Sequence, residues 1–354
     1  MTNYGAAPAS DQVEVTLFGP GYGEAIVLHL GEGVWLMVDS CIDPESKQPA
    51  SGSYLEGLGV KADQVRAIIA SHWHDDHVRG ISKLASAYPA ADFVLSAVFN
   101  NMEASAFLAA YGGKSSAGLA RGGKELFGAV EGRNNVFPAL HRSIVFQDTL
   151  NGRPVIVTAL SPLPAAYAAF LANLAQYLPT EGDPINHAPE LRPNMEAVTL
   201  HLDLGSDAIL LGADLEEHQA YGWSAVVSDS WSGARKPSTA YKVAHHGSVT
   251  GHCPEVWATL LQTDPVACLT PFSLGSVGLP TEGDATRLRA HTKHVHVTSA
   301  TSRRPEMDSR LLKRMSTTCK KLARADGGFG AVRLRKGIGA STWNVELFGA
   351  ARTL

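Results

Sequence analysis

The sequence of 354 residues contains little cysteine and no strong excess of charge of either sign. Its four cysteines, at positions 41, 253, 268 and 319, are far apart and form no C-x-x-C pair, which favours reduced thiols over a disulfide framework. The formal net charge is −4 and the pI is about 6.4, so the chain has no overall attraction to nucleic acid or to an anionic membrane. Any such partner would have to be attracted locally.

Long apolar runs are also missing. No stretch reaches the roughly 18 apolar residues that a membrane helix needs. Residues 1–12 lack the basic start and the apolar run of a secretory signal. The chain also lacks a G-x-S-x-G motif, the sharp turn that presents a nucleophilic serine in many enzymes. We therefore expect a soluble cytoplasmic protein with no membrane partner; the sequence makes no prediction of its oligomeric state.

Apolar, β-branched segments predict strands in both halves of the chain. Three such runs at the N-terminus are separated by glycine-rich turns, which is typical of a meander. Helical spacing predicts helices at 164–178, 215–221 and 254–261. The predicted strands are 13–18, 25–30, 34–38, 65–70, 94–98, 155–160, 198–202, 208–211, 241–244, 266–269, 331–334 and 342–348.

Two strand-rich halves with interleaved helices predict an α/β protein, a layered sandwich of two sheets covered by helices. No short-period repeat or linker divides the chain, so we predict a single domain over residues 1–354. Within it we expect an inserted helical region at about 100–190 and a basic C-terminal helix at about 307–325. The glycine-rich stretch 112–132 is expected to be a surface excursion.

The segment Ser71-His72-Trp73-His74-Asp75-Asp76-His77 places three imidazoles and two carboxylates directly after a predicted strand. Imidazole nitrogen and carboxylate oxygen are the ligands of Zn, Mn and Fe ions. In an extended segment His72 and His74 point the same way. If a helix begins next, Asp76 and His77 are brought to a second position nearby. The pattern therefore predicts a loop that can serve two adjacent metal ions.

The pattern His72-x-His74-x-Asp76-His77 resembles the H-x-H-x-D-H signature of the metallo-β-lactamase superfamily, whose fold is a four-layer αβ/βα sandwich with metals at one edge. Residues 209–214, which end in Gly212-Ala213-Asp214, resemble the family's strand that ends in glycine-x-aspartate. Residues 243–248, which contain His245-His246-Gly247-Ser248, resemble its last metal-binding strand end. With Asn194 and residues 197–198, that last pattern is similar to the ComEC-like branch, which includes the hydrolase domain of a DNA-uptake channel and the choline-phosphate esterases.

The resemblance implies a site with two divalent cations, Zn²⁺ first and Mn²⁺ as the alternative. It implies a catalytic role for Asp76 as well as metal binding. His245 is then free to contact the substrate or protonate the leaving group, and an exchange of roles between His245 and His246 is the alternative. Asp39 is expected to orient a ligand histidine. The implied ligands are His72 and His74 for the first metal, Asp76, His77 and His246 for the second, and Asp214 between them.

The sequence departs from the family pattern at one ligand. The third histidine of the first metal falls at Asn194, so Asn194, His187, His201 or a water molecule would complete that site.

Two metals would lower the pKa of a shared water and supply hydroxide at neutral pH. The resulting expectation is a metal-dependent hydrolase, with a phosphodiester, in DNA or RNA, as the favoured substrate. Alternatives are an amide, lactone or thioester hydrolase of the β-lactamase kind, a di-iron redox centre, and a partner protein that keeps the fold without the activity. Eleven lysines and arginines between 303 and 336 could add affinity for phosphate.

Overall fold

The computed structural model describes most of the chain. His187, Cys319 and most of the predicted basic helix lie outside the described residues. The described residues are 3–20, 23–100, 117–175, 193–274, 277–300, 310, 314, 317 and 328–354.

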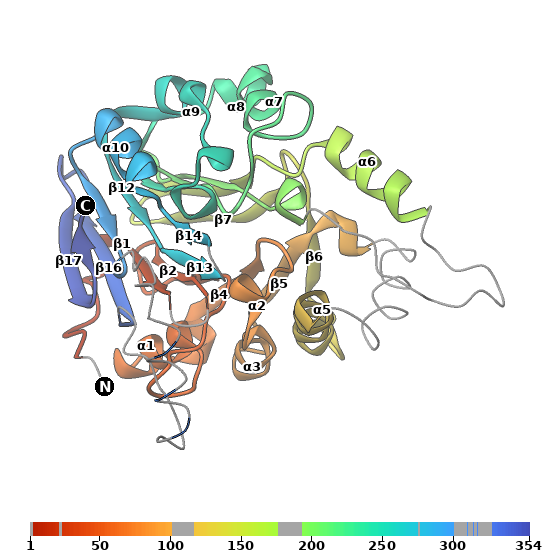
Figure 1. The fold of residues 1–354 in the computed structure, drawn as a ribbon. Coiled ribbons are helices and arrows are strands. Elements are labelled where there is room, and N and C mark those ends of the chain that lie inside the picture. Colours follow the sequence, from red (N-terminus) through yellow and green to blue (C-terminus); the bar gives the residue numbers. More distant parts are fainter. Residues whose placement is uncertain are drawn as a thin grey trace.

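Two large sheets form the centre of the described structure (Figure 1). The first has the order β17-β16-β1-β2-β3-β4-β5-β6 and the second β18-β15-β12-β11-β10-β9-β8-β7. A small hairpin pairs β13 (Phe272–Leu274) with β14 (Val277–Leu279). The first sheet contains β1 (Gln12–Gly19), β2 (Ala25–His29), β3 (Trp35–Val38), β4 (Val65–Ala70), β5 (Asp92–Ser96), β6 (Val136–Ala139), β16 (Gly330–Gly337) and β17 (Asn344–Gly349). The second contains β7 (Ile144–Leu150), β8 (Arg153–Ala159), β9 (Leu200–Asp203), β10 (Ala208–Leu211), β11 (Ser238–Lys242), β12 (Leu261–Leu269), β15 (Val295–Val297) and β18 (Arg352–Thr353).

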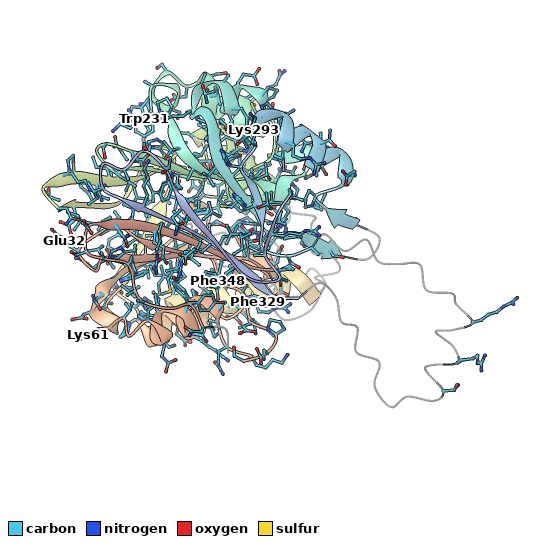
Figure 2. The ribbon with its side chains drawn as sticks, turned by 90° about the vertical axis from the view of Figure 1, so that its left-hand side faces the viewer. Glu32, Lys61, Trp231, Lys293, Phe329 and Phe348 are labelled. Atoms are coloured by element: carbon cyan, nitrogen blue, oxygen red, sulfur yellow. The ribbon has the colours of Figure 1, made fainter. Side chains whose placement is uncertain are left out.

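Helices cover the outer face of each sheet (Figure 1). In the view across the layers, Lys61 lies on one outer side, Trp231 and Lys293 lie on the other, and the strands lie between (Figure 2). On the side of the first sheet are α1 (Ala50–Gly57), α2 (Asp75–Val78), α3 (Ile81–Ala87) and α5 (Ala117–Val130). On the side of the second are α7 (Trp223–Ser228), α8 (Ser230–Gly233), α9 (Pro254–Thr259) and α10 (Glu282–His291), while α6 (Pro164–Ala175) lies near the sheet ends.

Side chains that point alternately to the two faces of each sheet form three apolar layers. In β3, Trp35 and Met37 pack with the helices, while Leu36 and Val38 enter the core between the sheets. In β10, Leu210 faces the opposite helical layer. Because successive strand side chains point to opposite faces, each sheet is buried on both sides. The predicted αβ/βα sandwich is therefore confirmed.

The helix predicted at 215–221 is wrong. These residues form loop and turn, with one bond of helical spacing from the backbone N–H of Gly222 to the carbonyl oxygen of His218, and α7 begins at Trp223. The backbone N–H of Glu217 donates to the carbonyl of Thr250, and its carboxylate accepts from the backbone N–H of Ser224, 2.9 Å away. Glu217 is thus used in contacts with the loop at Thr250 and with the first turn of α7, and the helix begins about two turns after the predicted start.

The stretch 112–132 is also not a surface excursion where it is described, because it forms α5. Its glycines permit close packing: a Cβ at Gly122 would lie 2.0 Å from the carbonyl oxygen of Trp73. Leu126 and Ala129 are buried against the first helical layer. The region 100–190 holds α5 and α6, and it also contributes β6, β7 and β8 to the sheets.

Parallel pairing positions the candidate site. β3 and β4 are parallel in the first sheet, and β10 and β11 are parallel in the second. The carboxyl ends of parallel strands meet at one edge of a sheet, where ligands commonly bind. None of the helices in the described part of the chain has the length and apolar character that crossing a membrane requires.

Candidate metal centre

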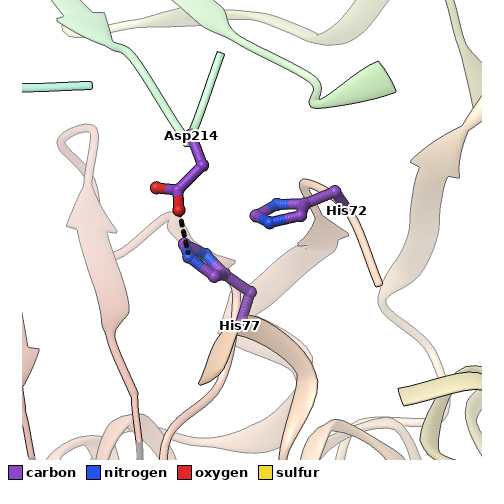
Figure 3. A group of neighbouring side chains, drawn as sticks. All are labelled: His72, His77 and Asp214. Atoms are coloured by element: carbon purple, nitrogen blue, oxygen red, sulfur yellow. Dashed lines mark ion pairs between the residues drawn. The ribbon is translucent and has the colours of Figure 1, made fainter. Parts of the chain in front are cut away.

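Three segments far apart in the sequence meet at this edge. After β4, the chain runs through His72 and His74 into α2, which carries Asp76 and His77. Nε2 of His77 lies 3.3 Å from Oδ2 of Asp214, which follows β10 (Figure 3). Nε2 of His246, which follows β11, lies 3.3 Å from the same oxygen. The three segments therefore converge at this edge.

Acceptor partners fix the orientation of two imidazoles. Nδ1 of His77 lies 2.7 Å from Oδ2 of Asp39, and Nδ1 of His246 lies 3.0 Å from the carbonyl oxygen of Thr270. A carbonyl or an ionised carboxylate accepts and cannot donate, so each Nδ1 carries the hydrogen. In the neutral ring, the lone pair of Nε2 is then directed toward Asp214. This is the arrangement in which a carboxylate or carbonyl orients a metal-ligating histidine.

His72 is oriented through a serine. Both the backbone N–H and the hydroxyl of Ser71 donate to Asp39, each at 2.7 Å. Since its hydrogen is used, the hydroxyl accepts from Nδ1 of His72, 3.0 Å away. Nε2 of His72 then lies 3.1 Å from Nδ1 of His74. These two nitrogens are a pair of candidate donors for the first metal.

The backbone is strained where the side chains leave the strands. Asp39, Ala213, His245 and His246 have positive φ angles of 60°, 42°, 46° and 52°. Residues other than glycine rarely adopt this conformation, and such residues gather at functional sites. Here the sharp turns direct side chains from the ends of three strands, β3, β10 and β11, into one space.

The sequence did not single out two buried charges at the site, Glu24 and Lys242. Glu24 is 1% exposed, and its Oε1 forms an ion pair with Nζ of Lys242. Nζ of Lys242 also lies 3.6 Å from Oδ1 of Asp214. The signal that could have revealed them is a charged residue within an apolar strand, in Tyr241-Lys242-Val243, and a glutamate directly before the apolar β2.

The carboxylates and imidazoles shift one another's protonation. Burial lowers the pKa of His72 well below its usual value, and it also lowers the pKa of His74. Burial opposes the charged form of His246 too, but Asp214 and Asp76 outweigh it and raise the pKa of His246 to about 10. In the same way, Asp214 and Asp39 raise the pKa of His77 well above its usual value. A cation would replace these protons, so its affinity would fall as the pH falls.

The residues fit a divalent cation. Nε2 of His77, Nε2 of His246 and Oδ1 of Asp214 are buried without a hydrogen-bond partner in the described part of the chain. Polar atoms buried in that state are costly and call for a ligand. Within the described residues, ligand atoms close enough to share an ion belong to His72, His77 and Asp214, to Asp76, His77 and His246, and to Glu24, Asp39 and His77. In the last group, Asp39 already accepts from Ser71 and His77, and Glu24 is paired with Lys242.

The residues considered for the incomplete first site lie in different places. Asn194, in η3 (Pro193–Glu196), borders the site: its Nδ2 donates to Glu216, and it lies 3.3 Å from Nε2 of His245. His201 is on β9, and its Nε2 lies 2.8 Å from the carbonyl oxygen of Lys236. His201 belongs to none of the ion-sharing groups among the described residues. His187 lies outside those residues.

His245 differs from its neighbour. It is half-buried, and its Nδ1 lies 2.7 Å from the hydroxyl of Thr250. The ion-sharing groups found in the described residues include His246 and not His245. The geometry therefore favours His246 over His245 as the ligand.

The basic residues between 303 and 336 are partly committed to internal contacts. Arg333 pairs with Glu346 at 2.8 Å, Arg335 with Glu14 at 2.6 Å, and Lys336 with Asp207 at 2.5 Å. These three are therefore unsuited to binding phosphate.

Comparisons with known proteins agree with this geometry. Residues 18–150 match the family model described as the metallo-beta-lactamase superfamily. No curated protein matches the chain in sequence.

Solved structures of similar shape have low sequence identity. The metallo-beta-lactamase fold protein YhfI from Bacillus subtilis is 14% identical, with 82% of this chain and 97% of that chain covered and a TM-score of 0.42. The subclass B3 metallo-beta-lactamase MEM-A1, from a soil metagenome library, is 17% identical over 69% of this chain and 80% of that chain, with a TM-score of 0.35. A metallo-beta-lactamase from Cronobacter sakazakii is 18% identical over 64% and 76%, with a TM-score of 0.34.

The matched residues carry β2 to β7 and the histidine segment after β4. The second sheet supplies the remaining carboxylate and imidazole. Residues 18–150 therefore resemble the metallo-β-lactamase superfamily, whose members are generally metal-dependent hydrolases, and the two-sheet sandwich matches the fold of that superfamily.

Proposed function

We propose that the protein is a metal-dependent phosphodiesterase or nuclease with two divalent cations. The observation that carries the proposal is the convergence of His72, His77, His246, Asp76 and Asp214, several of whose buried ligand atoms lack a hydrogen-bond partner among the described residues. We assign His72 and His74 to one cation, Asp76, His77 and His246 to the other, and Asp214 to both. The two ions would be Zn²⁺ or Mn²⁺, which bind imidazole and carboxylate.

When bound, two such ions lower the pKa of a shared water and stabilise negative charge on the attacked centre. The protein's own part is to hold the ligands. Asp39 orients His77 directly and His72 through Ser71. Pre-set orientation of this kind reduces the rearrangement that the reaction requires.

The phosphodiester class is supported by the rim of the site. His245, Asn194 and Thr250 form a continuous polar contact beside the ligand residues. If a substrate displaced the contact between Asn194 and His245, Nδ2 of Asn194 and Nε2 of His245 could each donate a hydrogen bond to an oxygen of a tetrahedral phosphate. We assign His245 to substrate contact, where it can also assist departure of the leaving group.

The test is turnover of bis-p-nitrophenyl phosphate, single-stranded DNA and nitrocefin by the metal-loaded protein, with metal content measured in parallel. We expect about two metals per chain and hydrolysis of the phosphodiesters. Turnover of nitrocefin alone would reject the phosphodiesterase assignment in favour of a lactam hydrolase.

Neighbouring aspartates provide a matched control. Asp76→Asn should lower kcat/KM by more than about 100-fold, since even outer partners of ligands contribute 10- to 100-fold. Asp75→Asn should change it little, because Asp75 pairs with Arg79 and joins none of the ion-sharing groups in the described residues. Equal losses in both variants would contradict the assignment of Asp76.

A further inference from the structure

Lys242 is a buried cation whose surroundings fix its position. It ends β11, it is 1% exposed, and the chain continues beyond the strand to His245 and His246. Its Nζ donates to the carbonyl oxygen of Ala213 at 2.8 Å, pairs with Glu24 and lies 3.6 Å from Asp214. A lysine ammonium has three hydrogens: two are directed at Ala213 and Glu24, and the third can point toward Oδ1 of Asp214 in a longer ion pair.

The two oxygens of Asp214 consequently have different surroundings. Oδ1 lies toward Lys242. Oδ2 lies 3.3 Å from Nε2 of both His77 and His246. Without Lys242, rotation of the carboxylate could exchange these oxygens or present both of them to the imidazoles.

Glu24 supports Lys242 from the other side. Its two oxygens lie 3.8 Å from Nδ1 of His77 and Nδ1 of His246, behind the rings. Its backbone N–H donates to the carbonyl oxygen of Asp76 at 2.9 Å. Glu24 therefore contacts the backbone of the histidine segment and, through Lys242, the aspartate of the second sheet.

We propose that Lys242 is a positioning residue that holds Asp214 with Oδ2 toward the cations, and that Glu24 holds Lys242 in place. This inference rests on the proposed two-metal site and goes beyond it, since it assigns a role to two residues outside the ligand set. It links the ligands of one sheet to those of the other through a buried ion pair.

The test is the double variant Glu24→Gln with Lys242→Met, which removes one charge of each sign and leaves the sum unchanged. Breaking a buried pair on one side alone leaves an unpaired charge, so the single variants are less informative. The affinities for Co²⁺ and Mn²⁺ would be measured by competition with a chromophoric chelator, together with the visible spectrum of the Co²⁺ form. We expect affinity to fall by about 10- to 100-fold, as for other outer partners of metal ligands, and the spectrum to change.

A second buried pair serves as the matched control. Lys336 and Asp207 also form an ion pair between a lysine and a carboxylate, and both residues are 9% exposed. The double variant Asp207→Asn with Lys336→Met should keep the parental metal affinity and spectrum, whatever its stability. Parental affinity in the Glu24→Gln, Lys242→Met variant would overturn the positioning role. Failure of the parental protein to bind two cations would instead overturn the proposed function.

Discussion

Among single residues, Asp214 supplies a negative charge at the centre of the site. It lies between His77 and His246 and raises the pKa of both. Asp214→Asn keeps the shape and removes the charge, so metal affinity and hydrolysis should both be lost, by more than about 100-fold. Chelator competition and kcat/KM on bis-p-nitrophenyl phosphate measure the two effects. A variant that still binds two cations with parental affinity would remove Asp214 from the ligand set.

Glu196 gives a prediction about stability and pH. It is 3% exposed, and burial raises its pKa to about 8 from a usual value of 4.5. Because the folded state keeps the proton that the unfolded state loses, stability is full below about pH 4.5. It then falls by about 1.4 kcal/mol per pH unit as the pH rises toward 8, up to a few kcal/mol in all.

Glu196→Gln should therefore be more stable than the parent at pH 8.5 and similar to it at pH 5, as measured by urea unfolding. The exposed Glu131→Gln is the control and should differ little from the parent at either pH. If the difference in free energy of unfolding between Glu196→Gln and the parent were the same at pH 5 and at pH 8.5, ionisation of Glu196 in the folded state would cost little.

Single residues also explain which parts of the site the sequence could predict. The segment from His72 to His77 contains several residues of the types that bind metal, so metal binding could be predicted from this segment alone. Glu24 and Lys242 each resemble an ordinary charged residue, and their meaning depends on a partner more than 200 positions away. That contact exists only once the two sheets face each other.

At the scale of elements, the turn before β2 packs against the segment that carries the metal ligands. Gly23 has a φ of 123°, and a Cβ there would lie 1.8 Å from the carbonyl oxygen of Asp76. Gly23→Ala must displace one of the two segments. We expect a loss of more than about 3 kcal/mol in the free energy of unfolding, a size typical of strain and overpacking.

Urea unfolding measures that loss, and Gly57→Ala is its control. Gly57 lies at the end of α1, where a Cβ would meet no atom within 4 Å, so the change should stay within about 1 kcal/mol. If Gly23→Ala were as stable as Gly57→Ala, the turn and the ligand segment would not be tightly packed in solution.

Strands were easier to predict than the segments between them. Runs such as 65–70 are apolar, and they become strands because both faces of each sheet are buried. Residues 215–221 have helical spacing, but Glu217 bonds to Thr250 and Ser224 instead. The local pattern predicts poorly here because the backbone of Glu217 bonds to a distant loop, which the spacing of nearby residues does not reveal.

At the scale of the whole molecule, one core joins both sheets. Residues from β2 and β3 of the first sheet pack with residues from β9 and β10 of the second. We propose that the sheets unfold together and that cations bound between them stabilise the entire fold. A ligand at about 100 times its Kd adds about 2.7 kcal/mol.

Adding Mn²⁺ or Zn²⁺ to the stripped protein should therefore raise Tm by several degrees in a single transition, since 1 kcal/mol shifts Tm by roughly 2–4 °C in domains of 150–250 residues. Calorimetry with and without EDTA measures the shift, and Asp214→Asn should abolish it. Identical Tm values in both conditions would argue against a metal held between the sheets.

The short strand β18 has a consequence for self-association. Its Arg352 and Thr353 pair with β15, and the hydroxyl of Thr353 lies 3.0 Å from Nδ1 of His296. Two residues offer too little free backbone for another chain to extend the sheet. Removing residues 351–354 would expose the edge of β15, whose three residues are all buried. The shortened protein should then aggregate more readily, because another chain could pair with this strand.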